Sequence, residues 1–176
     1  MFKTTRLLAT VIATALAIGP TVAETYEITV TSLLDEELLA PFVVTGVHND
    51  PVIFSGDYVT AAGESQVLTG NTAFIVEAIG DDPVVVGRGI DGEPGYLIGP
   101  GSSVTVSLET EATALRIMAM VAPTLQEDTY VTGVVDVNAG DTRTIELDRY
   151  DIGYDEKRRT REWTGTSAAR VEIVRR

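Results

Sequence analysis

Three carboxylates surround a single glycine in the segment LDRYDIGYDEKRR, where Asp148, Asp151 and Asp155 flank Gly153. Carboxylates gathered at a turn can bind Ca²⁺, which takes six to eight oxygen ligands and tolerates flexible loops. Acidic residues are so frequent in this chain that pairs four positions apart also arise by chance. The spacing alone therefore leaves two interpretations open, a shared metal site and ordinary solvated surface charge, and the second is the commoner one.

Gly153 adds a geometric argument for the first interpretation. A glycine lets the backbone turn sharply, so Asp151 and Asp155 can converge, whereas an extended strand would hold them more than about 10 Å apart. The chain contains neither an EF-hand loop nor the glycine-rich repeat of calcium-binding β-helices. A calcium site here would thus belong to another structural type.

The residues for nucleophilic catalysis are sparse. Cysteine is absent, and the one histidine, His48, lies in GVHND, where we expect a turn or capping residue at a strand end. No G-x-S-x-G or H-E-x-x-H motif occurs. A hydrolase using paired carboxylates stays open as an alternative, although six Tyr, four Phe and one Trp offer little material for a sugar-stacking cleft. We expect a protein that is not an enzyme.

The charge is strongly acidic, with a formal net charge of −13. Residues 24–156 hold 24 acidic and four basic residues, whereas residues 157–176 hold seven basic and two acidic ones. Binding to nucleic acid or to anionic lipid requires clustered Lys and Arg, so we expect neither partner. The basic tail is interrupted by Thr, Glu and Ala, and we expect it to pair with the acidic body.

The first 23 residues have the pattern of an export signal: a short basic start, an apolar run and small residues before a cut after Ala23. The sequence predicts one mature domain over Glu24–Arg176, exported to the periplasm or secreted, with no stable membrane insertion after signal removal. Without cysteines, such a domain depends on core burial, a metal ion or both.

Period-two runs of β-branched residues dominate the mature chain and predict an all-β antiparallel sandwich or barrel. The interval 61–83 alternates less, and TAFIVEAIG within it is predicted as one or two helical turns, with a buried strand as the alternative. Residues 156–167 are expected to form an exposed polar connection. The predicted strands are Thr25–Ser32, Phe42–His48, Ser102–Leu108, Leu115–Ala122, Tyr130–Val137, Thr142–Tyr150 and Ala168–Arg176.

Four segments in collinear order resemble the spondin domain, the calcium-binding β-sandwich of F-spondin that also occurs as stand-alone exported bacterial proteins. They are YEITVTSLLDEELLAPFVVTGVHND, LRIMAMVAPT, DRYDIGYD and ARVEIVRR, which together span the chain from Tyr26 to its end. The resemblance implies a C2-like β-sandwich of about eight strands with one or two short helical segments.

The resemblance also implies a calcium site of three carboxylates. Asp151 matches the aspartate of the family's Y-D-x-G segment, and Asp155 matches the acid four positions further on. The third ligand follows the P-[ST] strand, where this chain reads PTLQEDTYV and is two residues longer than the family pattern. Asp128 fits best there, with Glu127 as the alternative, and Asp148 becomes an ordinary strand residue.

The sequence thus predicts a secreted or periplasmic module that binds Ca²⁺ and serves adhesion or extracellular binding without catalysis. A cell-surface or extracellular protein or glycan is the expected partner. Two alternatives remain, a calcium-supported carboxylate hydrolase and a purely structural envelope protein in which the acids only promote solubility.

Overall fold

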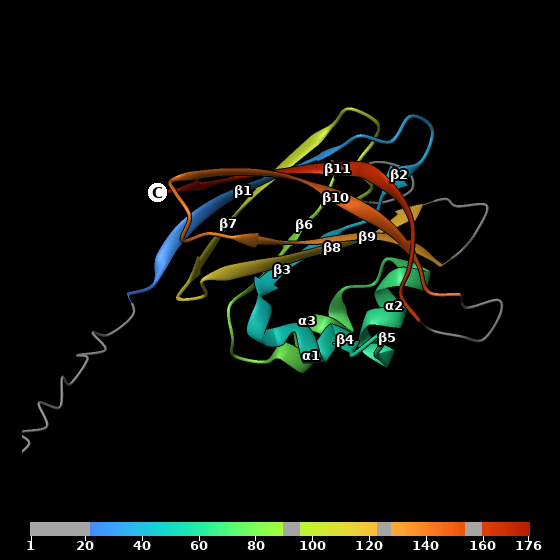
Figure 1. Cartoon of the computed structure of the whole chain (residues 1–176), viewed down its shortest axis with the longest axis horizontal. Coiled ribbons are helices and arrows are strands. Elements are labelled where there is room, and N and C mark those ends of the chain that lie inside the picture. Colours follow the sequence, from blue (N-terminus) through green and yellow to red (C-terminus); the bar gives the residue numbers. More distant parts are fainter. Residues whose placement is uncertain (1–21, 90–95, 123–127, 154–159) are drawn as a thin grey trace, which may run out of the picture.

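The computed structural model describes residues 22–89, 96–122, 128–153 and 160–176, with the side chain of Thr166 excepted. The expected signal segment lies outside these ranges, apart from Val22 and Ala23. The described chain is mainly antiparallel β-sheet with three short helices, which confirms the predicted all-β class (Figure 1).

Along the chain, all three α-helices come before β6. The elements are β1 (Glu24–Ser32), β2 (Leu38–Leu39), β3 (Phe42–Gly46), a 3₁₀ turn (Val47–Asn49), α1 (Asp50–Ile53), β4 (Phe54–Ser55), β5 (Tyr58–Val59), α2 (Ala61–Thr69), α3 (Ala73–Ile79), β6 (Val84–Gly87), β7 (Ser103–Thr110), β8 (Ala114–Ala122), β9 (Thr129–Asp136), β10 (Thr142–Asp151) and β11 (Glu162–Arg175).

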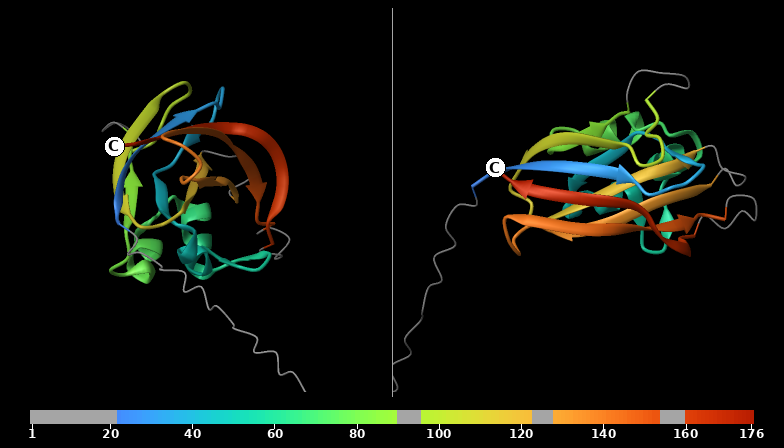
Figure 2. Two further views of the ribbon diagram at one scale, coloured as in Figure 1. Left: turned by 60° about the vertical axis from the view of Figure 1, so that its left-hand side comes forward. Right: turned by 90° about the horizontal axis from the view of Figure 1, so that it is seen from above.

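One continuous sheet folds over into two facing layers. Its strand order is β6-β3-β8-β9-β10-β11-β1-β7, with β2 paired to β8 in addition, and β4 and β5 form a separate hairpin. Strands β6, β3, β8 and β9 make one layer, and β10, β11, β1 and β7 make the other, which curls around it (Figures 1 and 2). The layers join through β9 and β10, and the other side ends in the two edge strands β6 and β7.

The main core lies between the two layers and explains the alternation along the outer layer. In β1 the side chains of Tyr26, Ile28 and Val30 are buried, while their neighbours are partly exposed. Alternate residues of a strand face opposite sides, so a half-buried strand shows a period of two. This alternation allowed β1 to be predicted from sequence.

A second core covers the opposite face of the inner layer. There α1, α2 and α3 pack on β3 and β8, so these two strands are buried on both faces. Helix α2 is fixed by the buried Gln66, whose amide donates to the carbonyl oxygens of Pro41 and Met118 at 3.2 and 3.1 Å. Within the described ranges, no helix combines the length and apolarity needed to cross a membrane.

The seven predicted strands are present, and TAFIVEAIG forms the helix α3 and not a buried strand. The interval 61–83 also contains α2, so it is more helical than the one or two turns predicted. Helix α2 begins after Thr60, whose hydroxyl accepts from the N–H of Gly63, and it ends at Gly70 with φ of 69°. The expected polar connection over residues 156–167 is wrong in its second half, because β11 already begins at Glu162. Polar residues occupy this stretch because it is largely exposed, and exposure removes the apolar alternation.

Strand β10 bends where it passes from one layer to the other. Its register with β11 shifts between Leu147 and Arg149 and again between Arg149 and Tyr150. Such bulges bend a strand and increase its twist. Beyond them, residues 148–151 pair with β9 as well, so the bend carries the end of β10 onto the inner layer. The predicted metal ligands lie at this junction.

Candidate functional site

Two of the three predicted calcium ligands lie at neighbouring strand ends. Asp128 immediately precedes β9, and Asp151 is the last residue of β10. Asp151 is paired with Thr129, and the N–H of Ile152 donates to the carbonyl oxygen of Asp128 at 3.2 Å. Strand pairing therefore holds the backbones of these two acids side by side.

The chain turns immediately after Asp151. The backbone N–H of Gly153 donates a short hydrogen bond to Oδ1 of Asp151, and Gly153 has φ of 60°. An aspartate that binds the backbone two residues on forms an Asx turn, and glycine adopts the left-handed conformation without strain. The backbone conformation expected for a turn is thus present at Gly153, and Asp155 itself lies outside the described residues.

Asp128 is the more deeply buried of the two acids, with 4% of its surface exposed. A carboxylate at this depth is stable only where hydrogen-bond donors or a cation compensate for the lost water. A divalent cation shared with Asp151 would supply such compensation through oxygen ligands. Asp128 therefore differs from the exposed acidic residues, because its buried carboxylate must interact with a donor or a cation.

The other two acids in the prediction, Asp155 and the alternative ligand Glu127, lie outside the described residues. Among the residues that are described, no three His, Asp or Glu side chains are grouped so that they could hold a metal ion. The structure thus brings together Asp128 and Asp151 and leaves the third ligand a prediction.

Asp148 occupies a different position from Asp151. It lies within β10, paired with Thr132 of β9, three residues before the strand ends. Asp148 is therefore part of the strand body, as the sequence predicted, and it offers a matched control for Asp151.

An aromatic and cationic cluster lies next to this junction, and sequence analysis missed it. Tyr130 and Tyr150 are paired across β9 and β10, with ring centroids 5.6 Å apart and planes inclined by 27°. The guanidinium of Arg161 lies 4.2 Å from the ring centroid of Phe54 and 5.4 Å from that of Tyr150. Cation–π contacts of this kind tie the β4–β5 hairpin to the start of β11.

The only available signal was the placement of Tyr130 and Tyr150 beside the predicted ligands, in DTY and RYD. Their contact depends on the pairing of β9 with β10, and Phe54 is distant in sequence from both. Local patterns do not contain that information, so the cluster could not be predicted from spacing.

Tyr130 is fully buried, and among the described residues its hydroxyl makes no hydrogen bond of good geometry, although the guanidinium of Arg161 lies near it. Burial raises the pKa of Tyr130 to about 12, and the nearby guanidinium of Arg161 opposes that rise only in part. Because the phenolate is disfavoured in this environment, the folded protein keeps Tyr130 neutral where the unfolded chain ionises it. The ionisation of Tyr130 therefore leaves the free energy of unfolding unchanged well below pH 10 and lowers it as the pH rises from 10 to 12.

Tyr130→Phe should remove this alkaline loss of stability. We expect the free energy of unfolding of the variant to be close to that of the wild type at pH 7, since the hydroxyl makes no hydrogen bond of good geometry among the described residues, and to exceed it by about 2–3 kcal/mol near pH 12. Urea denaturation followed between pH 7 and 12 measures the difference. Tyr58→Phe, at an exposed ring, is the control, and parallel pH profiles for wild type and Tyr130→Phe would contradict the assignment.

His48 lies in the 3₁₀ turn that follows β3, as expected for a residue at a strand end. Its Nε2 is 3.4 Å from Oδ2 of Asp82, and both side chains are largely exposed. This position is far along the inner layer from the turn at Gly153, and His48 therefore takes no part in the candidate metal site.

Comparison with known proteins adds no family assignment. No protein-family model matches the chain, and no curated protein is significantly similar to it. The functional argument therefore rests on the residues and their geometry.

Proposed function

We propose that the protein is an exported, non-catalytic calcium-binding β-sandwich module that serves adhesion or extracellular binding. The observation that carries the proposal is the pairing at the ends of β9 and β10, which holds Asp128 beside Asp151. Asp155 follows the turn at Gly153 in the sequence and is the proposed third ligand, with Glu127 as the alternative to Asp128. The resemblance to the spondin domain supports the same three carboxylates.

The electrostatics favour a dication at such a site. Three carboxylates without a cation repel one another, whereas Ca²⁺ leaves a net charge of about −1 and satisfies several oxygen atoms at once. Mg²⁺ fits less well, because it demands a stricter octahedral geometry and keeps its water ligands. Calcium would also connect two loops in a chain that has no cysteine to form disulfides.

Calcium should therefore stabilise the protein against heat. Binding to the folded state alone contributes about 2.7 kcal/mol at a hundredfold excess over Kd, which for a domain of this size raises Tm by about 5–10 °C. Thermal unfolding of the purified protein in calcium and in a chelator tests this, with magnesium as the comparison ion. Identical melting curves in calcium and chelator would disprove the metal site.

Single substitutions identify the ligands. Asp151→Asn and Asp155→Asn should each abolish most of the calcium-dependent shift in Tm, whereas Asp148→Asn, from the same strand, should retain it. Asparagine keeps a side-chain oxygen that can accept from the N–H of Gly153, so the turn survives and only the charge is lost. If Asp148→Asn reduced the calcium-dependent shift in Tm as much as Asp151→Asn does, the assignment of the ligands would be wrong.

A further inference from the structure

A bidentate ion pair joins the loop between β1 and β2 to the end of β10. Arg149 donates from Nη1 to Oε2 of Glu37 at 2.7 Å and from Nη2 to Oε1 at 2.6 Å. Both side chains are partly buried, with 27% of Arg149 and 29% of Glu37 exposed. The loop lies at the end of the sheet where β10 ends (Figures 1 and 2). Because two parallel hydrogen bonds fix both the position and the orientation of a guanidinium, the charge of Arg149 has a defined place.

Arg149 lies on the same face of β10 as the proposed ligand Asp151. The two residues are paired with Val131 and Thr129 of β9, and the register between them does not shift. Alternate residues of a strand line one face, and two residues along a strand span about 6.8 Å. The long side chain of Arg149 can therefore reach the carboxylate of Asp151 as well as that of Glu37.

The backbone at Arg149 is irregular on its other side. The register of β10 with β11 shifts both before and after this residue. Bulges of this kind redirect a side chain and occur often beside functional sites. The residue at the bulge is thus the one whose guanidinium Glu37 binds.

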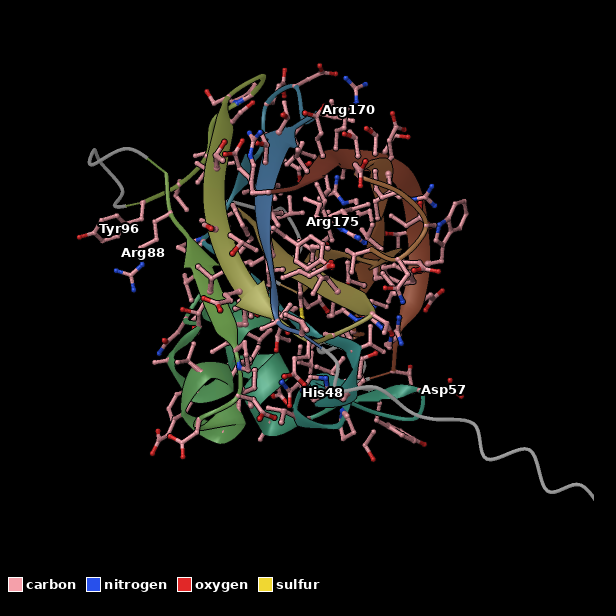
Figure 3. The ribbon with its side chains drawn as sticks, turned by 90° about the vertical axis from the view of Figure 1, so that its left-hand side faces the viewer. His48, Asp57, Arg88, Tyr96, Arg170 and Arg175 are labelled. Carbon is pink, nitrogen blue, oxygen red and sulfur yellow. The ribbon has the colours of Figure 1, made fainter. Side chains whose placement is uncertain are left out.

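Two bases of β11 have carboxylate partners at other positions. Arg170 pairs with Glu146 at 3.5 Å, and Arg175 pairs with Glu24 at 3.0 Å (Figure 3). Arg170 is opposite Glu146, before the bulge, and Arg175 lies still nearer the start of β10. Arg149 is instead the base that the strand geometry brings close to the proposed calcium site.

We propose that Glu37 is a positioning residue for calcium binding: it holds Arg149 and thereby keeps this base from competing with Ca²⁺ for Asp151. The inference rests on the proposed function, because it assigns Glu37 a role in binding the same ion. A guanidinium and Ca²⁺ bind the same carboxylate oxygens, and their charges repel each other. Without the carboxylate of Glu37, the partly buried guanidinium pairs with Asp151, and calcium has to displace it.

Calorimetric titration of the purified variants with calcium tests the order of affinities. Glu37→Gln should raise Kd about tenfold, because the released guanidinium then lies beside the cation. Arg149→Gln should bind calcium as tightly as the wild type or more tightly. Combining Glu37→Gln with Arg149→Gln should restore Kd to within about threefold of the wild-type value. If the pair acted only as a clamp between loop and sheet, both single substitutions would raise Kd and the double variant would not recover, and this result would overturn the proposal.

Glu36→Gln is the matched control for charge. It removes an exposed carboxylate at the neighbouring position and leaves the pair of Glu37 with Arg149 intact. At about 0.15 M salt, where the Debye length is about 8 Å, its effect on Kd should stay within about twofold. Equal increases in Kd for Glu36→Gln and Glu37→Gln would reduce the effect to general attraction by negative charge and would overturn the role of Arg149.

A second readout needs no calcium. With a chelator present, the Nε–Hε NMR signal of Arg149, identified by its loss in Arg149→Gln, reports the partner of the guanidinium. Asp151→Asn should shift this signal clearly in the Glu37→Gln background and much less where Glu37 is present. Equal shifts in the two backgrounds would overturn the exchange of partners. Absence of calcium binding by the wild type would instead overturn the proposed function, and with it the role of Glu37, whatever the NMR signal shows.

Discussion

Replacing Asp50 by asparagine is expected to lower the free energy of unfolding by about 3 kcal/mol or more. The carboxylate of Asp50, at the start of α1, accepts two hydrogen bonds from Arg116 of β8, at 2.9 Å from Nε and 2.6 Å from Nη2. Arg116 is only 8% exposed and keeps its charge in proteins. The substitution leaves that charge buried without its counter-ion.

The surroundings of Arg116 do not replace the lost carboxylate. Its Nη1 donates to the hydroxyl of Thr132 at 3.3 Å, and its guanidinium lies 5.2 Å from the ring centroid of Phe54. These neutral contacts satisfy part of the guanidinium but carry no negative charge. The pair therefore also anchors α1 to the sheet, and its loss should loosen the helical layer first.

Urea denaturation measures the effect. The double variant Asp50→Leu with Arg116→Met should recover much of the stability, because removing both charges avoids the unpaired one. Glu146→Gln, which breaks an exposed pair with Arg170, should leave the unfolding midpoint close to that of the wild type. If Asp50→Asn changed the free energy of unfolding by less than about 0.5 kcal/mol, the pair would contribute no more than an ordinary surface contact.

The strands that face water on one side were predictable because burial imposes a period of two on their sequence. Strand β1 shows this most clearly, with Tyr26, Ile28 and Val30 buried in alternation. Strand β6 escaped prediction, because Val84–Gly87 is short, consists of consecutive Val and follows a turn. Its neighbours in space, β3 and the helices, decide its structure, and they are not visible in a local window.

The sequence predicted the parts of the candidate site that depend on local features, namely a strand end and a turn. The turn at Gly153 follows from the glycine and from the preceding Asp151. The neighbour relation between Asp128 and Asp151 is not local, and only the resemblance to a known domain predicted it. The contact of Arg161 with Phe54 depends on the order of strands in the sheet, and neither route predicted it.

Phe42→Ala is the second substitution expected to have a large effect, a loss of about 3–5 kcal/mol in the free energy of unfolding. Phe42 is fully buried in the main core, and it is paired with Gly87 of β6. A Cβ atom placed on Gly87 would approach Cζ of Phe42 to 2.0 Å. The phenyl ring therefore covers the glycine, and this contact fills the space at one of the four residue pairs that join β6 to β3.

The two positions should be strongly coupled. Gly87→Ala alone should cost about 1–3 kcal/mol, because the methyl group displaces a ring that has no free space around it. Once Phe42→Ala has removed the ring, the added methyl group enters vacated volume, so the double variant should lose clearly less than the sum of the single losses. Urea denaturation of the wild type and the three variants gives the coupling free energy between the two positions. Additive losses would show that the ring and the glycine do not compete for the same space.

Hydrogen exchange separates a local effect from a global one. If the ring holds β6 in place, Gly87→Ala should speed amide exchange in Val84–Val86 more than in Ile117 and Met118 of β8, because an edge strand can open without unfolding the core. An equal acceleration in both strands would instead mean that β6 opens only with the whole domain. The first result is the one that the ladder of β6 implies, since among the described strands β6 pairs with β3 alone.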